Sequence, residues 1–281
     1  MPESYLPQRI VSLQPSITVT LRDLGLLHRL VACTKYCLDV CPELSQQQCL
    51  VVEDSWTAKA ELILAARPDL VIASVPYQIE ALAEIMKAGI PFVGFSPKSL
   101  SDVYSDIATI ARIAGAESKG FEIIHRMRSE ILAVQEKVVN LEKPLVYCEE
   151  WGKPLILSQK WVAELVEAAA GRFYGEPGKQ VSVDQVQSAN PDVIIAAWCG
   201  AGDRVPLEKI IVKRGWEDLK AVRQQRVYCI NDEFLNTPAS TLIDGLRALA
   251  SAIQPDQFAT PPGLRRMNAI SSLQGTSLPT T

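Results

Sequence analysis

The sequence predicts an α/β protein of two Rossmann-like lobes with parallel sheets, joined by one long helix. Residues 116–140 lack proline and repeat apolar side chains every three or four positions, which predicts a helix of about 22 residues and about 33 Å. Segments 61–73 and 184–196 share an order of features: an acid, a short helical pattern, Pro-Asp and an apolar run. Strand-like and helix-like segments alternate along the chain, as in parallel α/β sheets.

The repeat and the long helix together predict how the chain divides. We expect an N-terminal α/β lobe at residues 1–115, a connecting helix at 116–140 and a C-terminal α/β lobe at 141–256. Residues 257–281 are rich in Pro, Ser, Thr and Gly, and this composition predicts a disordered tail.

In the first lobe, short apolar runs predict strands and amphipathic segments predict helices. The region 35–56, rich in Cys, Gln and Pro, shows neither pattern and is expected to be irregular. The expected strands are residues 9–13, 30–34, 69–73 and 91–95. The expected helices are residues 17–28, 57–66, 77–89 and 100–114.

The second lobe repeats this alternation. Residues 149–154 follow its first strand and are expected to form a loop, and Trp216 is expected to pack in the core. The expected strands are residues 145–148, 193–197 and 226–230. The expected helices are residues 161–170, 183–189, 207–212 and 238–253.

Charge and hydropathy exclude several classes of protein. A net charge of −4 without a basic run argues against nucleic-acid binding. The longest apolar stretches are strand-sized, so no transmembrane segment is expected. The N-terminus lacks a basic segment followed by a long apolar core, so no signal peptide is expected. The chain is then cytoplasmic or the mature form of an exported protein.

The seven cysteines are scattered, which favours free thiols in a reducing compartment. Cys33, Cys37 and Cys41 lie four residues apart and on a helix would share one face, but the following Pro42 disfavours helix at Cys41. We therefore expect no metal site. A cytosolic metal or redox enzyme using residues 33–41 is the alternative from another class.

The segments that follow strands carry the candidate binding residues, because ligands of parallel sheets lie beyond the carboxyl ends of the strands. Aromatic and polar side chains collect there. One such ring often only covers the end of a core, but the set favours a large flat ligand. The expected ligand-binding residues are Gln14, Ser16, Tyr36, Trp56, Tyr77, Glu150, Trp151, Trp198, Asp232 and Phe234.

The sequence is poor in signals of catalysis. It contains no Gly-rich phosphate loop, GxSxG, HExxH or paired CxxC motif. We expect no catalytic residue and no cofactor of its own. An enzyme would have to use acids such as Glu149, Glu150 or Asp232.

Four segments and the long helix resemble the substrate-binding proteins of ABC importers for vitamin B12 and iron chelates, over about residues 8–254. The segments are RIVSLQPSITVTLRDLGLLHRLVAC, RPDLVIAS, CEEWGKPLILSQKWVAELVEAAAG and GWEDLKAVRQQRVYCIND. Tyr36, Trp56 and the segment that begins CEEWG make the chain most similar to the cobalamin-binding branch.

The resemblance implies a non-catalytic monomer that binds cobalamin or a related corrinoid in a cleft between the lobes, with little hinge motion. It implies an ABC permease and ATPase as partners and a periplasmic or cell-surface location. Glu61 and Asp184 match the acids that dock on permease arginines, although an acid there also complements a helix dipole. A ferric-siderophore or haem carrier, with Tyr36 or Tyr77 on the iron, is the alternative of the same class.

Overall fold

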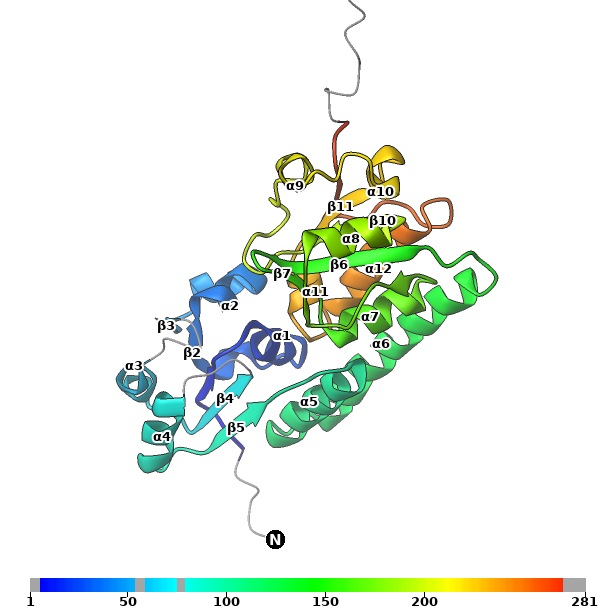
Figure 1. Ribbon diagram of the computed structural model, residues 1–281. Coiled ribbons are helices and arrows are strands. Elements are labelled where there is room, and N and C mark those ends of the chain that lie inside the picture. Colours follow the sequence, from blue (N-terminus) through cyan, green and yellow to red (C-terminus); the bar gives the residue numbers. More distant parts are fainter. Residues whose placement is uncertain (1–5, 54–58, 75–78, 270–281) are drawn as a thin grey trace, which may run out of the picture. The chain divides into compact units, whose positions relative to one another are not determined.

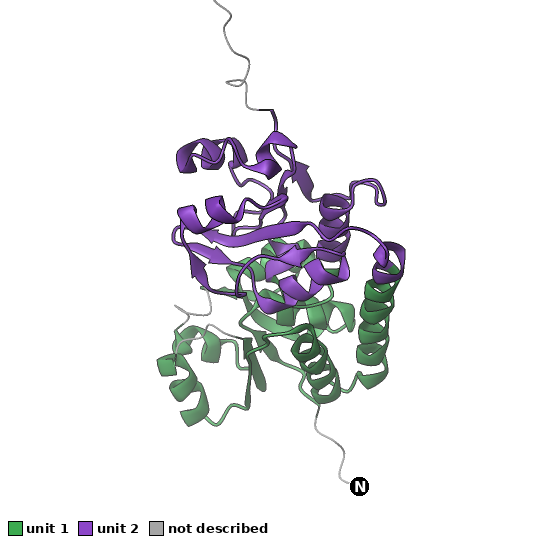
Figure 2. Cartoon of the chain, turned by 45° about the vertical axis from the view of Figure 1, so that its right-hand side comes forward, with its two compact units in different colours: residues 1–133, 237–243 green, residues 134–236, 244–281 purple. Residues whose placement is uncertain are grey.

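The computed structural model describes residues 6–53, 59–74 and 79–269. The chain divides into two compact units (Figure 2). Unit 1 comprises Met1–Ala133 and Thr237–Ile243, and unit 2 comprises Val134–Asn236 and Asp244–Thr281. The boundary falls within helix α6, Glu117–Val138, which confirms the long helix predicted at residues 116–140.

Within its described residues, unit 1 holds a five-stranded sheet in the order β3-β2-β1-β4-β5, with every pair parallel (Figure 1). The strands are β1 Ile10–Ser12, β2 Leu30–Thr34, β3 Leu50–Val52, β4 Leu70–Ser74 and β5 Phe92–Phe95. The helices are α1 Pro15–Asp23, α2 Lys35–Val40, α3 Ala60–Ala65, α4 Ile79–Lys87 and α5 Leu100–Ile113, with 3-10 turns η1 Leu27–Arg29 and η2 Pro42–Gln46.

Unit 2 holds a seven-stranded sheet among its described residues, in the order β12-β11-β10-β6-β7-β9, with β8 paired to β6. The strands are β6 Leu145–Gly152, β7 Leu155–Leu157, β8 Arg172–Phe173, β9 Gln180–Val181, β10 Val193–Ala196, β11 Val227–Ile230 and β12 Leu264–Arg266. The helices are α7 Lys160–Ala168, α8 Val183–Ala189, α9 Leu207–Arg214, α10 Lys220–Arg223, α11 Glu233–Asn236 and α12 Leu242–Ile253.

The two-lobed α/β fold is as predicted, but the second sheet is mixed, not parallel throughout. Strands β6, β10 and β11 are parallel, while β7, β9 and β12 run antiparallel to their neighbours. The loop expected at residues 149–154 is instead the end of β6 and its turn into β7. Residues 264–266, placed by the sequence in a disordered tail, form β12 against β11.

The region 35–56 also differs from its prediction. It contains α2, η2 and β3, so β2 has a parallel partner at this edge of the sheet. Cys33 lies in β2, Cys37 in α2 and Cys41 caps that helix, which ends before Pro42 as the proline predicts. The three cysteines therefore do not share one helical face.

The repeated Pro-Asp motif has the same role in each unit. The Asp69 carboxylate accepts hydrogen bonds from the backbone N–H groups of Gln8 (2.8 Å) and Arg9 (2.9 Å), just before β1. The Asp192 carboxylate accepts one from the N–H of Leu145 (2.7 Å), the first residue of β6. Each aspartate fixes the start of a neighbouring parallel strand, which sets the register of β4 and β10.

The cores are apolar around the sheets. Val11, Ala32, Val71 and Ala73 are fully buried in unit 1. Trp216 is fully buried in unit 2, confirming its predicted packing role. Across the described ranges, no helix combines the length and apolar character needed to cross a bilayer.

Candidate functional site

The carboxyl ends of β6, β10 and β11 bring several predicted binding residues of unit 2 together. In the register of the sheet, Glu149 of β6 pairs with Ala196, the last residue of β10. The chain after β10 stays beside β6, because Ala197 N–H donates to the Glu149 carbonyl and Cys199 N–H to the Glu150 carbonyl. Trp198 therefore lies next to the end of β6.

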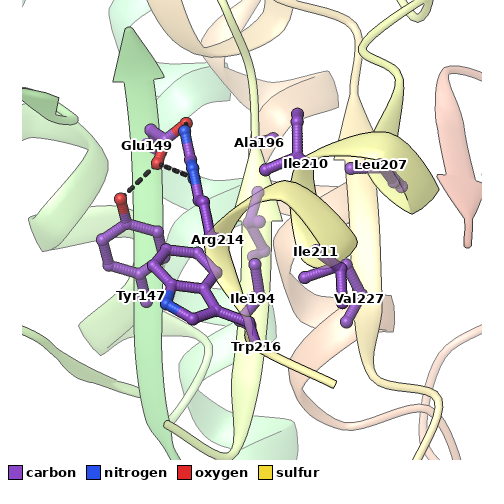
Figure 3. A pocket seen from close by; sticks show the side chains of 11 residues that line it. Tyr147, Glu149, Ile194, Ala196, Leu207, Ile210, Ile211, Arg214, Trp216 and Val227 are labelled. Atoms are coloured by element: carbon purple, nitrogen blue, oxygen red, sulfur yellow. Dashed lines mark hydrogen bonds and ion pairs between the residues drawn. The ribbon is translucent and has the colours of Figure 1, made fainter. Parts of the chain in front are cut away.

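Glu149 is the buried charge of this edge, with 1% of its side chain exposed. Arg214, at the end of α9, forms a bidentate ion pair with this carboxylate: its Nη1–H donates to Oε2 (2.8 Å) and its Nη2–H to Oε1 (3.0 Å). The Tyr147 hydroxyl also donates to this carboxylate, and Figure 3 shows the three side chains converging in a small pocket. Burial and the Glu149 charge raise the pKa of Tyr147, so its hydroxyl stays protonated and keeps donating.

The network also fixes Trp198. Its indole N–H donates to Glu149 Oε1 at 2.6 Å. The ring covers the backbone of Gly152, where an added Cβ would lie 2.1 Å from Trp198 Cζ2. Arg214 donates a further bond to the Gly152 carbonyl (3.1 Å). One face of the Trp198 ring is thus held against β6 by a hydrogen bond and by close packing.

Asp232 holds the loop that carries Trp198. Its carboxylate accepts from the backbone N–H groups of Gly200 (2.7 Å) and Gly202 (2.8 Å). Both glycines have positive φ, at 77° and 59°. The turn they form directs both of these N–H groups toward the carboxylate. Asp232 therefore shapes the loop after β10.

Glu150 and Trp151 lie on the last part of β6. Gln159 donates to the Glu150 carboxylate at 2.6 Å, and burial raises the pKa of Glu150. Trp151 leaves 45% of its surface exposed, and its indole N–H donates to the Lys153 carbonyl (3.0 Å). Trp151 is thus a large exposed ring at the edge of the sheet where ligands of α/β folds bind.

Phe234 lies in α11, just after β11, and is half-buried. Its ring packs on Gly263, where an added Cβ would lie 2.3 Å from Phe234 Cε2. Gly263 precedes β12, so a segment expected to be disordered supports one wall of the predicted site. Trp161 is buried in α7 and donates to the Leu235 carbonyl (2.8 Å), a packing role.

In unit 1, Gln14 and Ser16 lie directly after β1, and Ser16 lines a small pocket with Ser74, the last residue of β4. Tyr36 lies in the first turn of α2 after β2, half-buried, with Lys35 Nζ 5.0 Å from its ring centre. Trp56 and Tyr77 lie outside the described residues.

The remaining predicted residues are of two kinds. Glu61 and Asp184 are exposed in the first turns of α3 and α8, the helices before β4 and β10. In the cysteine region, the sulfurs of Cys33 and Cys49 lie 3.6 Å apart, and the Cys33 side chain also interacts with that of Cys37. Among the described side chains, no three of His, Cys, Asp or Glu gather in a way that could hold a metal ion.

Three acids at this edge are occupied by structural contacts, Glu149 with Arg214, Glu150 with Gln159 and Asp232 with two backbone amides. These contacts hold the side chains at this edge in place, as in a rigid surface on which a ligand could bind. Sequence reasoning missed Arg214 because it lies 65 positions from Glu149. It missed Tyr147 because this residue lies inside a predicted strand, two positions before Glu149. The adjacent acids directly after a buried strand were the only signal.

Comparisons with known proteins agree with this geometry. Residues 10–234 match the family described as periplasmic binding protein. The chain is 27% identical over 269 residues to an uncharacterized ABC transporter substrate-binding lipoprotein of Bacillus subtilis, covering 90% of this chain and 82% of the relative. It is 24% identical over 259 residues to a vitamin B12-binding protein of Vibrio cholerae, covering 88% and 89%.

The fold has a close counterpart among solved structures. A periplasmic haem-binding protein from Pseudomonas aeruginosa superimposes with a TM-score of 0.84, covering 94% of this chain and 99% of that one, at 21% identity. At this identity the likeness concerns the fold alone.

Proposed function

The chain belongs to the periplasmic binding protein family, and from that premise we propose that it is the substrate-binding component of an ABC importer for cobalamin or a related corrinoid. We also propose that the protein binds its ligand without changing it chemically and that it is exported to the periplasm or cell surface. The proposed binding site is the inter-lobe cleft that the resemblance implies.

The observation that carries the corrinoid proposal is the exposed Trp151 ring at the carboxyl edge of unit 2. The half-exposed indole leaves apolar area in contact with water, and a flat ligand that covers the ring would remove this area from water. An aromatic side chain can bury about 150–250 Å² in such a contact. Trp198, on the neighbouring residue Gly152, is fixed before any ligand arrives. A wall fixed in advance reduces the ordering cost of binding a large flat ligand.

Polar and aromatic residues at the other strand ends complete the proposed site. Gln14, Ser16 and Glu150 would meet the amide rim of a corrinoid. Asp232 would act through the loop it holds. The proposed ring contacts are Tyr36, Trp151, Trp198 and Phe234, together with Trp56 and Tyr77 from outside the described residues.

The second candidate is a ferric-siderophore or haem carrier, and Tyr36 is the observation that favours it. Its phenol lies half-buried after β2 and could ligate iron. His28 lies in η1, just before the amino end of β2, and His125 lies in α6, so neither histidine follows the carboxyl end of a strand. If iron is the cargo, Tyr36 is the ligand we expect from the described residues.

A panel of ligands separates the two candidates. The full chain is titrated with cyanocobalamin, with haemin and with a ferric siderophore, and tryptophan fluorescence and visible absorbance are recorded. We expect cyanocobalamin to quench tryptophan with a dissociation constant that is micromolar or tighter. The opposite result is a Soret or charge-transfer band that appears with the wild type and disappears in Tyr36→Phe, together with no quenching by cyanocobalamin. It would identify the ligand as an iron chelate or haem and not a corrinoid.

A further inference from the structure

A small pocket of unit 1 has polar side chains in its lining, together with buried isoleucines of α1 and α5. Ser16 and Thr20 of α1, Ser74 at the end of β4, Phe95 at the end of β5 and Asp106 of α5 line it. Its volume of about 10 Å³ is enough to admit about one water molecule. Ser74 and Phe95 are the last residues of the parallel strands β4 and β5, and α1 begins just after β1. The pocket therefore lies at the edge where α/β sheets bind ligands.

Asp106 is the charged group of this pocket. The acid one turn earlier, Asp102, caps α5 by accepting bonds from the N–H groups of Lys98 and Ser99, both at 2.9 Å. Asp106 takes no part in that cap. None of the described residues donates a hydrogen bond to its carboxylate or forms an ion pair with it. Burial and the nearby Asp102 charge raise the pKa of Asp106 to about 7.

Beside the Asp106 carboxylate, the hydroxyl oxygens of the pocket lining can accept hydrogen bonds. The Thr20 hydroxyl already donates to the Ser16 carbonyl (2.8 Å), so its oxygen is left with acceptor capacity. Apart from Asp106, no ionisable side chain lines the pocket in the described ranges. A half-buried carboxylate without a partner costs free energy, and a donor of small size offsets this cost.

We propose that this pocket is a subsite for one hydrogen-bond-donating group of the ligand, with the Asp106 carboxylate as acceptor. The subsite rests on the proposed function, and for a corrinoid the group is a primary amide of the ring's rim. The amide N–H₂ supplies donors and is small enough for the space. An added carboxylate at the same rim position would face a like charge.

The test uses cyanocobalamin and its isomeric monocarboxylic acids, in each of which one rim amide is replaced by a carboxylate. Calorimetric titrations are made about one pH unit above the pKa of Asp106, so that it is ionised. The wild-type chain should bind one isomer at least about tenfold more weakly than cyanocobalamin, through like-charge repulsion. In Asp106→Asn that penalty should shrink to about twofold, because the charge is gone.

Asp106→Ala should weaken cyanocobalamin itself about tenfold, because a hydrogen bond to a charged acceptor is lost. Ser105→Ala, an exposed change on the same helix turn, is the matched control. If the wild type binds cyanocobalamin but the pattern of isomers is unchanged in Asp106→Asn, the subsite is refuted while the proposed function stands. Absence of cyanocobalamin binding to the wild type overturns both.

Discussion

At the scale of single residues, Glu149 and Arg214 form a buried ion pair in unit 2. Arg214 is 10% exposed and its guanidinium also lies 4.8 Å from the centre of the Trp216 ring. A buried pair contributes little net stability, but removal of one partner leaves an uncompensated charge. The role of the pair is to fix positions: Glu149 accepts a hydrogen bond from the Trp198 indole, and Arg214 donates one to the Gly152 carbonyl.

Arg214→Met tests this directly. We expect the free energy of unfolding to fall by about 3–5 kcal/mol, because Glu149 stays buried without its cation. Urea denaturation measures the change. Lys213→Met, at the exposed neighbouring position, is the control and should change stability by less than about 0.5 kcal/mol. A small loss in Arg214→Met would mean that Glu149 is not held as a buried anion.

Asp192 provides a pH-dependent test. Burial acts to raise its pKa, but bonds from Lys220 (2.5 Å) and the Leu145 amide outweigh burial and the net pKa is lowered. The folded-state pKa lies below the unfolded one, so the stabilisation is present above about pH 3.9 and is lost as the pH falls through the lower folded value.

Asp192→Asn should therefore lower the free energy of unfolding by about 1 kcal/mol at neutral pH, a modest value because solvent screens part of the interaction. The difference from the wild type should vanish at acid pH. Denaturant titrations at several pH values measure it, with Asp218→Asn at an exposed position as the control. A difference that persists unchanged in acid would exclude the carboxylate as its source.

At the scale of elements, the end of β6 decides the shape of the site. Gly152 allows Trp198 to lie on the backbone, and a methyl group at this position would overlap the ring. Gly152→Ala should displace Trp198, at a cost of about 1–3 kcal/mol in stability from overpacking. Cyanocobalamin affinity should fall about tenfold.

Calorimetry and urea denaturation measure both effects, and Lys153→Ala, exposed at the next position, is the control. If Gly152→Ala binds cyanocobalamin as the wild type does, the placement of Trp198 has no part in binding.

The comparison of prediction and structure is clearest for β6. The sequence identifies its start, because residues 145–148 form an apolar run. Its end was missed because two successive acids, Glu149 and Glu150, followed by Gly152 are typical of a loop. The strand continues because Arg214 and Gln159, from distant parts of the chain, neutralise and bond these acids. Single-sequence patterns do not contain such tertiary partners.

At the scale of the whole molecule, the alternation of strands and helices and the internal repeat predicted the α/β class, the long helix and the parallel strands of each sheet. The antiparallel strands β7, β9 and β12 were missed because they are two or three residues long and carry no periodic pattern. Tyr36, Trp198 and Phe234 follow strands as predicted, whereas Trp151 lies within β6 and not in a loop after it. Asp106 was missed because it lies inside an amphipathic helix.

The exposed acids Glu61 and Asp184 belong to this scale, because we propose that each docks one unit on the permease. A Glu61→Ala/Asp184→Ala double variant should keep its cyanocobalamin affinity within about twofold and reduce ligand-stimulated ATP hydrolysis about tenfold, through loss of complementary charge. Proteoliposomes with the permease and ATPase measure this. Glu122→Ala, exposed on α6, is the control. Equal ATP hydrolysis in the double variant would assign the two acids to interaction with the helix dipoles alone.

The most direct test of corrinoid binding is a calorimetric titration of the full chain with cyanocobalamin, repeated on Trp151→Ala. The wild type should bind one equivalent with a micromolar or tighter dissociation constant, and Trp151→Ala should bind at least about tenfold more weakly, because the exposed ring loses its contact with the ligand. No heat from the wild type at millimolar cyanocobalamin, or equal affinity in the two proteins, would contradict the account.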